Sequence, residues 1–343
     1  MSKVKKIIIA ALIFVVLAIV AMIPIPYVIE SPGTAEEVSQ FLTISGAKDE
    51  DPGSLRVLTV YVEQATVLTY FKKFLKHHEM VPAEEVFGDY TPEEFDTLQD
   101  FSMRNARSKA VRVAFEAAGK TVERHVNGIF VTRVDPNSNF RDKLKVGDII
   151  ETIDGKSPGN TDESFEELRD YLASLEPGHT LVLQVKRDDA TMSIRGQLKM
   201  DSRTGGIRLG FGGEVDEDVT SDPSVEFDPH GVSGPSGGLM FTLEIYNQIT
   251  NSHLKNGHNI AGTGTIELDG TVGRIGGIDK KLVAAIEAGA TVFLAPDDEM
   301  RARYPDIKSN YEEVKEAAAK LGTDIKIYPV KTLDEAIEIL KNL

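Results

Sequence analysis

The segment Gly234–Gly238, with the sequence GPSGG, places a serine in a glycine-rich turn directly before a run with helical spacing. Ser236 is therefore expected at the N-terminus of a helix, where free backbone N–H groups and the helix dipole favour a developing oxyanion. Its neighbours Gly234, Pro235 and Gly237 are candidates for contacting substrate or oxyanion, because glycines let a substrate backbone approach closely. A serine at a helix start is usually only an N-cap, so a catalytic interpretation also requires a base.

One candidate base is Lys281, which lies in the segment Gly276–Ala285. This segment begins with two glycines and continues with helical spacing. It lies beside small residues that let another element pack close, namely Ala284, Ala285 and Ala288. A lysine in such surroundings loses hydration, which lowers its pKa toward the range where it accepts a proton. Lys280 instead shares a helix face with Glu287, as a solvated ion pair would. Without further context, a surface lysine on an amphipathic helix is the simpler interpretation of Lys281.

Histidine is the more usual partner of a serine nucleophile, and the G-x-S-x-G pattern raises an α/β-hydrolase as an alternative. The histidines downstream of Ser236 are His253 and His258, both within 22 residues, which leaves little chain for a strand with the acid. Asp228 and His230 precede the serine too closely to make convincing triad partners and are expected in a surface loop. A Ser-His-Asp esterase is therefore the less favoured alternative.

The composition is that of a globular chain with several folded units. Its 343 residues suffice for two or three domains of roughly 100–200 residues each. The formal net charge of −16 repels phosphates, so nucleic acid is not an expected partner. Cysteine is absent, which excludes disulfides, thiolate zinc sites and a cysteine nucleophile.

The first thirty residues predict a membrane anchor. Three lysines at positions 3, 5 and 6 precede an uncharged run from Ile7 to Ile29, which is long enough for a transmembrane helix of about 20 residues. We expect residues 7–29 to contact the lipid bilayer, with Ser31–Gly33 ending the helix. By the positive-inside rule the N-terminus is cytoplasmic and the remainder lies outside the cell membrane. No convincing signal-peptide cleavage site follows, so the anchor is expected to stay uncleaved.

The pattern of apolar residues elsewhere predicts an α+β protein. Strands are expected at 56–68, 225–227, 260–268, 291–294 and 325–328. Helices are expected at 103–119, 239–249, 280–288, 311–321 and 333–340.

A separate small β-rich unit is expected between residues 128 and 200. Its strands and turns include Gly128–Val134, Leu144–Ile150 and Ile153–Lys156, and a helix and a further strand follow at 165–175 and 181–187. This order resembles a bacterial PDZ domain, which implies capture of an extended peptide as an added strand. Leu209–Gly212 is similar to the carboxylate loop of other PDZ domains but follows the complete pattern, so we expect it in a strand of the next domain.

Three stretches together resemble the proteolytic domain of the Lon proteases: Gly234–Gly238, Thr263–Arg274 and Ile275–Lys281. The resemblance implies that Ser236 is the catalytic nucleophile and Lys281, rather than Lys280, the general base. It places the family's threonine at Thr263, which could orient the lysine. Gly237 stands where the family usually has alanine, and this departure removes no reacting group.

The resemblance implies a domain organisation: cytoplasmic N-terminus and anchor at 1–30, a first part of the proteolytic domain at 31–124, the PDZ domain at 125–200, and the main catalytic part at 201–343. This order is similar to membrane-bound Lon-like PDZ peptidases of bacteria. The sequence contains no phosphate-loop motif G-x-x-x-x-G-K-[ST], so we expect an ATP-independent serine endopeptidase without cofactor or metal.

Expected substrates are peptides and flexible protein segments, including membrane-tethered or secreted ones, and a homo-oligomer is a further expectation. The alternative from a different class is an inactive, membrane-tethered PDZ scaffold, which the filled Ser, Lys and Thr positions disfavour.

Overall fold

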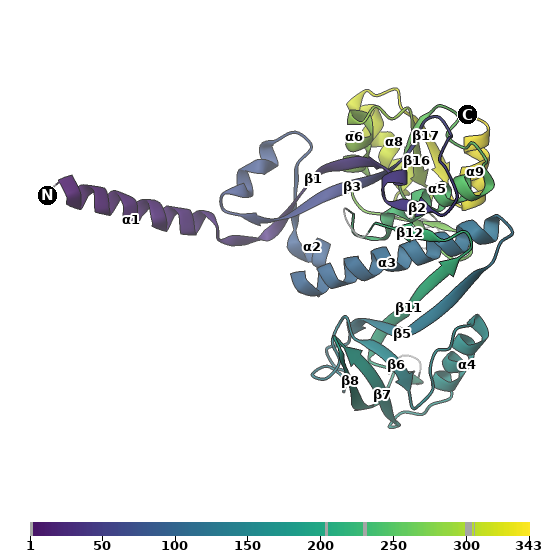
Figure 1. Ribbon diagram of the computed structural model, residues 1–343. Helices are drawn as coiled ribbons and strands as arrows, with labels where there is room; N and C mark the ends of the chain where they lie inside the picture. Colours follow the sequence, from purple (N-terminus) through teal and green to yellow (C-terminus); the bar gives the residue numbers. More distant parts are fainter. Residues whose placement is uncertain (1–2, 203–204, 229–231, 299–303, 305) are drawn as a thin grey trace.

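The structure is a computed structural model that describes residues 3–202, 205–228, 232–298, 304 and 306–343 (Figure 1). A long N-terminal helix projects from a body of helices and strands, and a smaller β-rich unit lies on the other side of the long helix α3. The mixture of helices and strands confirms the α+β class.

The N-terminal helix α1 is shorter than the sequence indicates. It spans Lys3–Ala21, has a mean hydropathy of 2.7 and buries none of its residues, as a membrane-spanning or signal segment would. The prediction that residues 7–29 continue as one helix is wrong, because strand β1 occupies Pro24–Glu37 and includes Ser31–Gly33. Pro24 and Pro26 lack the N–H donors that a helix needs, and β1 instead pairs with two strands.

The body is built on a six-stranded sheet of order β17-β16-β13-β3-β1-β4. Its remaining strands are β3 (Ser54–Thr66), β4 (Glu79–Pro82), β13 (Asn259–Gly262), β16 (Val292–Pro296) and β17 (Lys326–Val330). Strands β3, β13, β16 and β17 are mutually parallel, whereas β1 and β4 run antiparallel to their neighbours. The sheet thus joins chain segments about two hundred residues apart in the sequence.

Helices cover both faces of this sheet. They are α3 (Pro92–Ala117), α5 (Gly238–Thr250), α6 (Ile278–Glu287), α8 (Asn310–Leu321) and α9 (Leu333–Lys341). One buried cluster joins residues of α3, α5 and α9 with Ile260, and another joins residues of α6 and α8 with Ala261. Adjacent residues of β13 therefore face opposite cores, as the alternation of a strand requires.

Most of the expected elements are confirmed to within a few residues. The expected strand at 260–268 is divided into β13 and the short β14 (Thr265–Ile266). Helix α3 begins eleven residues earlier than expected, because Thr91 and Glu94 form a capping box with Pro92 at the first position. Shorter elements are η1 (Val38–Gln40), β2 (Leu42–Ile44), η2 (Thr69–Phe74), α2 (Ala83–Phe87), β9 (Lys199–Met200), β10 (Ile207–Arg208), β12 (Val225–Phe227), η3 (Pro235–Gly237) and β15 (Val272–Gly273).

The smaller unit has its own sheet and core. Its strand order is β11-β5-β6-β7-β8, and α4 (Asp162–Ala173) joins β6 to β7. The strands are β5 (Val122–Val134), β6 (Ile149–Ile153), β7 (Thr180–Arg187), β8 (Ala190–Gln197) and β11 (Phe211–Ser221). A separate cluster that includes Val131, Phe140, Ile150 and Leu183 fills this unit.

Strand β11 belongs to this sheet, which corrects the expectation that Leu209–Gly212 starts a strand of the next domain. β11 pairs with β5 along its whole length. Leu209 and Phe211 pack against the core of the smaller unit, where Phe211 meets Phe140 edge to face at 5.3 Å. A boundary at residue 200 therefore cuts through the sheet.

Helix α3 connects the smaller unit to the body. Arg112 and Arg124 both bind the buried carboxylate of Glu217 on β11, at 2.8 and 2.7 Å. Phe101 of α3 stacks on Phe130 of β5 with the ring centroids 3.9 Å apart. These contacts orient the β5–β11 ribbon relative to the helix that also packs on α5.

Core packing around α5 yields a stability prediction. Phe241 is fully buried and meets the rings of Phe41 and Phe227 edge to face. Phe241→Ala should lower the free energy of unfolding by about 3–5 kcal/mol, because it leaves a cavity in a packed core. Leu268, which is 40% exposed, is the control, and its alanine variant should lose about 0.5 kcal/mol or less. Urea unfolding of the full chain in detergent micelles, followed by circular dichroism, measures both; equal losses would contradict the assignment of this core.

Candidate active site

Ser236 lies in a 3-10 turn, η3, directly before α5. Its carbonyl accepts a hydrogen bond from the Gly264 N–H (2.8 Å), and the Leu239 N–H donates to the Gly264 carbonyl (3.1 Å). On the other side, the Gly234 N–H donates to the carbonyl of Gln99 on α3 (3.3 Å). The chain after β13 and helix α3 thus hold the turn from both sides. The contribution of Gln99 had no signal in the sequence, since a backbone carbonyl is independent of residue type.

Lys281 reaches this turn from α6. The helix starts after Gly277, which adopts a left-handed conformation with φ of 63°. Lys281 is 3% exposed, and its Nζ lies 2.7 Å from Oγ of Ser236. A buried amine and a half-buried hydroxyl, from residues 45 positions apart, therefore meet in one contact.

Thr263 connects the other two residues. It is fully buried at the end of β13, and its Oγ1 lies 3.1 Å from the Ser236 carbonyl and 3.0 Å from Nζ of Lys281. A threonine hydroxyl has one hydrogen, which goes to the carbonyl, so it accepts from the lysine. This pairing directs one N–H of Lys281 away from Ser236.

Burial lowers the pKa of Lys281 to about 7, from an ordinary value of 10.5. Loss of hydration is the cause, because charging an amine in a water-free environment is unfavourable. Near neutral pH a substantial share of the protein therefore has an uncharged amine next to a hydroxyl. Such an amine can accept the hydroxyl proton.

The pKa of the adjacent lysine, Lys280, is shifted in the opposite direction. Lys280 was expected to pair with Glu287 in solvent, but it is only 6% exposed. It binds Glu79 on β4, Glu30 on β1 and its neighbour Asp279 on α6. Burial alone would lower the pKa of Lys280, but hydrogen bonding to Glu79 and the charge of Asp279 raise it above its ordinary value. The expectation failed because β1, which packs on α6, and β4, which carries Glu79, were not recognised as strands.

Ser236 and Lys281 line a cavity of about 570 Å³. Its walls come from β1, β3, α3, η3 and the loop before α6; the side chains include Glu30, Thr34, Leu58, Thr59, Tyr61, Val62, Gln99, Thr265 and Arg274. Gly234 and Pro235 also line the cavity, whereas Gly237 is buried against Val57 and Phe241. The site thus has room for a ligand beside the Ser–Lys contact.

Histidine is absent from the described residues that line this cavity. His253 is 58% exposed and lies 3.9 Å from Asp51, and the backbone of His258 bonds to Ser54 and Lys255. Asp228 is exposed, as expected for a loop residue, and His230 lies outside the described residues. The arrangement gives no support to a Ser-His-Asp triad.

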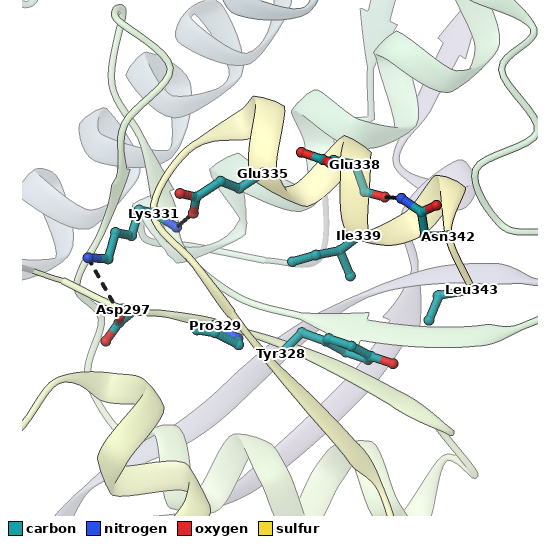
Figure 2. Close-up of a pocket in the computed structure, with 9 residues that line it drawn as sticks. All are labelled: Asp297, Tyr328, Pro329, Lys331, Glu335, Glu338, Ile339, Asn342 and Leu343. Carbon is teal, nitrogen blue, oxygen red and sulfur yellow. Dashed lines mark hydrogen bonds and ion pairs between the residues drawn. The ribbon is translucent and has the colours of Figure 1, made fainter.

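A second cavity, of about 510 Å³, lies between β17 and α9 (Figure 2). Its polar groups are engaged with one another: Lys331 Nζ lies 3.8 Å from Asp297, and the Lys331 N–H donates to Glu335. Ser236 and Lys281 are not part of its lining. It is a separate hollow near the end of the described chain.

Comparison with known proteins agrees with the geometry. Residues 229–342 match the Lon protease (S16) C-terminal proteolytic domain, and residues 102–198 match the PDZ domain family. The chain is thus similar to a PDZ domain in its middle part and to the Lon (S16) proteolytic domain in its C-terminal third. The first match starts a few residues before Ser236 and includes Thr263 and Lys281. The second includes β5 to β8 together with the C-terminal half of α3.

Individual relatives match over a limited length. The Lon protease of Campylobacter concisus is 36% identical over 110 residues, which cover 32% of this chain and 12% of that protein. The Lon protease of Buchnera aphidicola subsp. Schizaphis graminum is 35% identical over 106 residues, or 31% of this chain and 12% of that protein. A solved PDZ domain of an SdrC-like protein from Listeria monocytogenes is 26% identical, with a TM-score of 0.23, and covers 25% of this chain and 87% of that one.

The buried amine should make stability depend on pH. The folded-state pKa of Lys281 is about 7 and its ordinary value is 10.5, so between these values the unfolded chain binds more protons. Stability should therefore rise with pH across this window, by about 1 kcal/mol per pH unit, and Lys281→Met should remove this part of the slope. Urea midpoints of the full chain at several pH values measure it.

The control for this titration is Lys331→Met, since Lys331 is half exposed on the surface. It should leave the pH slope of the wild type in place. A wild-type slope equal to that of Lys281→Met would mean that the amine is charged when buried.

Proposed function

We propose that this protein is a serine endopeptidase in which Ser236 is the nucleophile and Lys281 the general base. The observation that carries the proposal is the 2.7 Å contact between Nζ and Oγ, made by a buried lysine whose pKa is about 7. The match of this segment to the Lon proteolytic domain supports the same assignment. The uncharged amine is the form that performs the first step.

In this mechanism the Ser236 proton moves to Nζ of Lys281 while Oγ bonds to the scissile carbonyl carbon. The tetrahedral intermediate collapses as the C–N bond breaks, and the Lys281 ammonium returns its proton to the leaving amine. Water then attacks the acyl-enzyme, Lys281 accepts its proton, and Oγ is released with the proton restored. Each half-reaction leaves the amine uncharged again.

The developing oxyanion needs N–H donors close to Ser236. Pro235 has no N–H, and the Gly234 N–H already donates to Gln99. We therefore assign the donors to the backbone N–H groups of Ser236 and Gly237, at the start of α5. Gly234 and Pro235 line the cavity and take the role of substrate contacts.

We further propose that the proteolytic domain has two parts, one before and one after the PDZ unit. The shared sheet supports this, because β1, β3 and β4 from the N-terminal part align with β13, β16 and β17. The PDZ unit, attached through α3 and the β5–β11 ribbon, would hold an extended peptide for cleavage. Helix α3 contacts both the serine turn and the PDZ unit. The carbonyl of Gln99 accepts a hydrogen bond from the serine turn, and Arg112 binds β11.

Membrane attachment is part of the proposal. Helix α1 has 19 residues, about 28 Å at 1.5 Å per residue, close to the roughly 30 Å of a hydrocarbon core. Lysines precede it, which favours a cytoplasmic N-terminus and an extracytoplasmic catalytic domain. We propose that the protein cleaves peptides and flexible protein segments at the outer face of the membrane.

Replacing either member of the dyad tests the proposal directly. Ser236→Ala and Lys281→Met should each lower kcat on a peptide substrate by at least about 10³-fold, because nucleophile and base act as one unit. In the wild type, kcat/KM should rise with pH through about 7 as Lys281 loses its proton. Steady-state assays with a fluorogenic peptide library provide both readouts.

A matched control is Ser233→Ala, since Ser233 lines the same cavity. It should keep a kcat within a few-fold of the wild type. Full turnover by Ser236→Ala or Lys281→Met would exclude the dyad.

Thr263 is proposed as a positioning residue for Lys281. Thr263→Val keeps the side-chain volume but removes both hydrogen bonds, so kcat should fall by roughly 10- to 100-fold while KM changes little. Thr263→Ser retains the hydroxyl and should restore most of the activity. The pH profile of kcat/KM distinguishes a positioning role from a packing role. If Thr263 positions the Lys281 amine, the midpoint of this profile should move in Thr263→Val but not in Thr263→Ser. Equal losses in both variants would indicate a packing role.

A further inference from the structure

An apolar patch is exposed on the loop between β3 and β4. Six large hydrophobic side chains within nine residues are at least 36% exposed: Val67, Leu68, Tyr70, Phe71, Phe74 and Leu75. Phe71 and Phe74 are 66% and 74% exposed, and in the described part of the chain they are the only exposed phenylalanines beyond α1. Single exposed hydrophobic residues are ordinary, but a contiguous group marks an interaction surface.

The charge of this loop is opposite to that of the chain. Residues 67–78, called here the 67–78 loop, contain Lys72, Lys73 and Lys76 and no acidic residue, whereas the whole chain has a formal charge of −16. Lys73 lies over the ring of Tyr70, 3.7 Å from its centroid. Aromatic and leucine side chains interleaved with lysines are the composition that binds the boundary between lipid headgroups and acyl chains.

The loop starts where α1 ends. β3 and β1 bring Thr66 opposite Pro24, and the next two N–H groups donate to the end of α1: Val67 to Ile23 (3.2 Å) and Leu68 to Ala21 (2.9 Å). In Figure 1 the loop between β3 and β4 lies beside the junction of α1 and β1. A bilayer crossed by α1 would have its surface at this level, because α1 is about as long as the hydrocarbon core is thick.

We propose that the 67–78 loop is a second membrane contact, which inserts its aromatic and leucine side chains into the surface of the bilayer that α1 crosses. The inference rests on the proposed anchoring of α1 but not on the proposed peptidase activity. Lipid is favoured as occupant by the continuity of the loop with α1 and by Lys73 and Lys76, which suit anionic headgroups, whereas Lys72 is paired with Glu63. The 67–78 loop would then be held both at its start, by α1, and by the lipid. These two attachments would restrict rotation of the body about the junction between α1 and β1.

This contact would set the height of the active site above the membrane. Tyr61 and Val62 of β3 line the Ser236 cavity, and β3 ends at Thr66, about 13 Å further along the strand. At its other end the loop continues into Glu79, which binds Lys280 beside Lys281. The substrates best placed for cleavage are therefore segments that emerge from the bilayer within a few residues of its surface.

The absence of cysteine makes a site-specific test straightforward. Single variants Phe74→Cys, Ile13→Cys and Met200→Cys of the full chain are labelled with an environment-sensitive fluorophore and reconstituted into vesicles of phosphatidylcholine and phosphatidylglycerol. Nitroxide-bearing lipids report contact with the bilayer, and iodide reports contact with water. Ile13 tests the anchor, and Met200, which is 63% exposed in the smaller unit, is the matched soluble control.

The expected result is strong quenching by nitroxide lipids at positions 13 and 74 but not at 200, with iodide quenching at 74 several-fold weaker than at 200. Quenching by lipid at 13 alone, with 74 open to iodide, would overturn the docking contact and leave the anchor intact. Shielding of 74 from both quenchers would also overturn it and would indicate a second protein copy on the patch. No lipid quenching at position 13 would overturn the anchor and the docking contact together.

Discussion

The structure depends on one contact: a lysine amine withdrawn from water and held between two hydroxyl groups. Burying a charged ammonium without a counter-ion is strongly unfavourable, whereas a neutral amine with hydrogen-bonding partners is tolerated. Ser236 and Thr263 supply those partners, and among the described residues no carboxylate forms an ion pair with Lys281. Three chain segments must therefore converge to within hydrogen-bonding distance, and the six-stranded sheet with α5 and α6 on opposite faces achieves this convergence.

The neighbouring lysine, Lys280, pairs with the acidic groups that lie near the cavity. Glu30 lines the same cavity as Lys281, and a free carboxylate there would raise the pKa of the amine. Lys280 Nζ lies 3.7 Å from Glu30 and also binds Glu79 and Asp279, so acidic charge near the cavity has its own cation. Successive helical residues point about 100° apart, which lets one lysine face these carboxylates while the next faces Ser236. The two adjacent lysines thus lie in opposite surroundings, Lys280 among carboxylates and Lys281 between two hydroxyl groups.

Local patterns in the sequence predicted the helices α5, α6, α8 and α9 to within two residues, because helical periodicity is a local property. The Ser236, Thr263 and Lys281 positions followed from family resemblance rather than from spacing. Pairings between distant segments could not be predicted from local sequence patterns. Strand β1 is a strand because it pairs with β3 and β4, and without that information its first apolar residues looked like a continuation of the membrane helix. The burial of Lys280 and the hydrogen bond to Gln99 were missed for the same reason, since both arise from tertiary packing.

Gly237 stands next to Ser236, at the position where the resemblance to Lon proteases leads us to expect alanine. Its φ of −90° is available to any residue, so backbone conformation does not require glycine there. A Cβ would lie 2.8 Å from Cγ2 of Val57 and 3.0 Å from the Phe241 ring, which leaves no room for alanine beside these side chains. Val57 of β3, which is buried in the same core, occupies the space beside the turn. The absence of a side chain at position 237 therefore lets the turn that carries Ser236 pack directly against Val57 and Phe241.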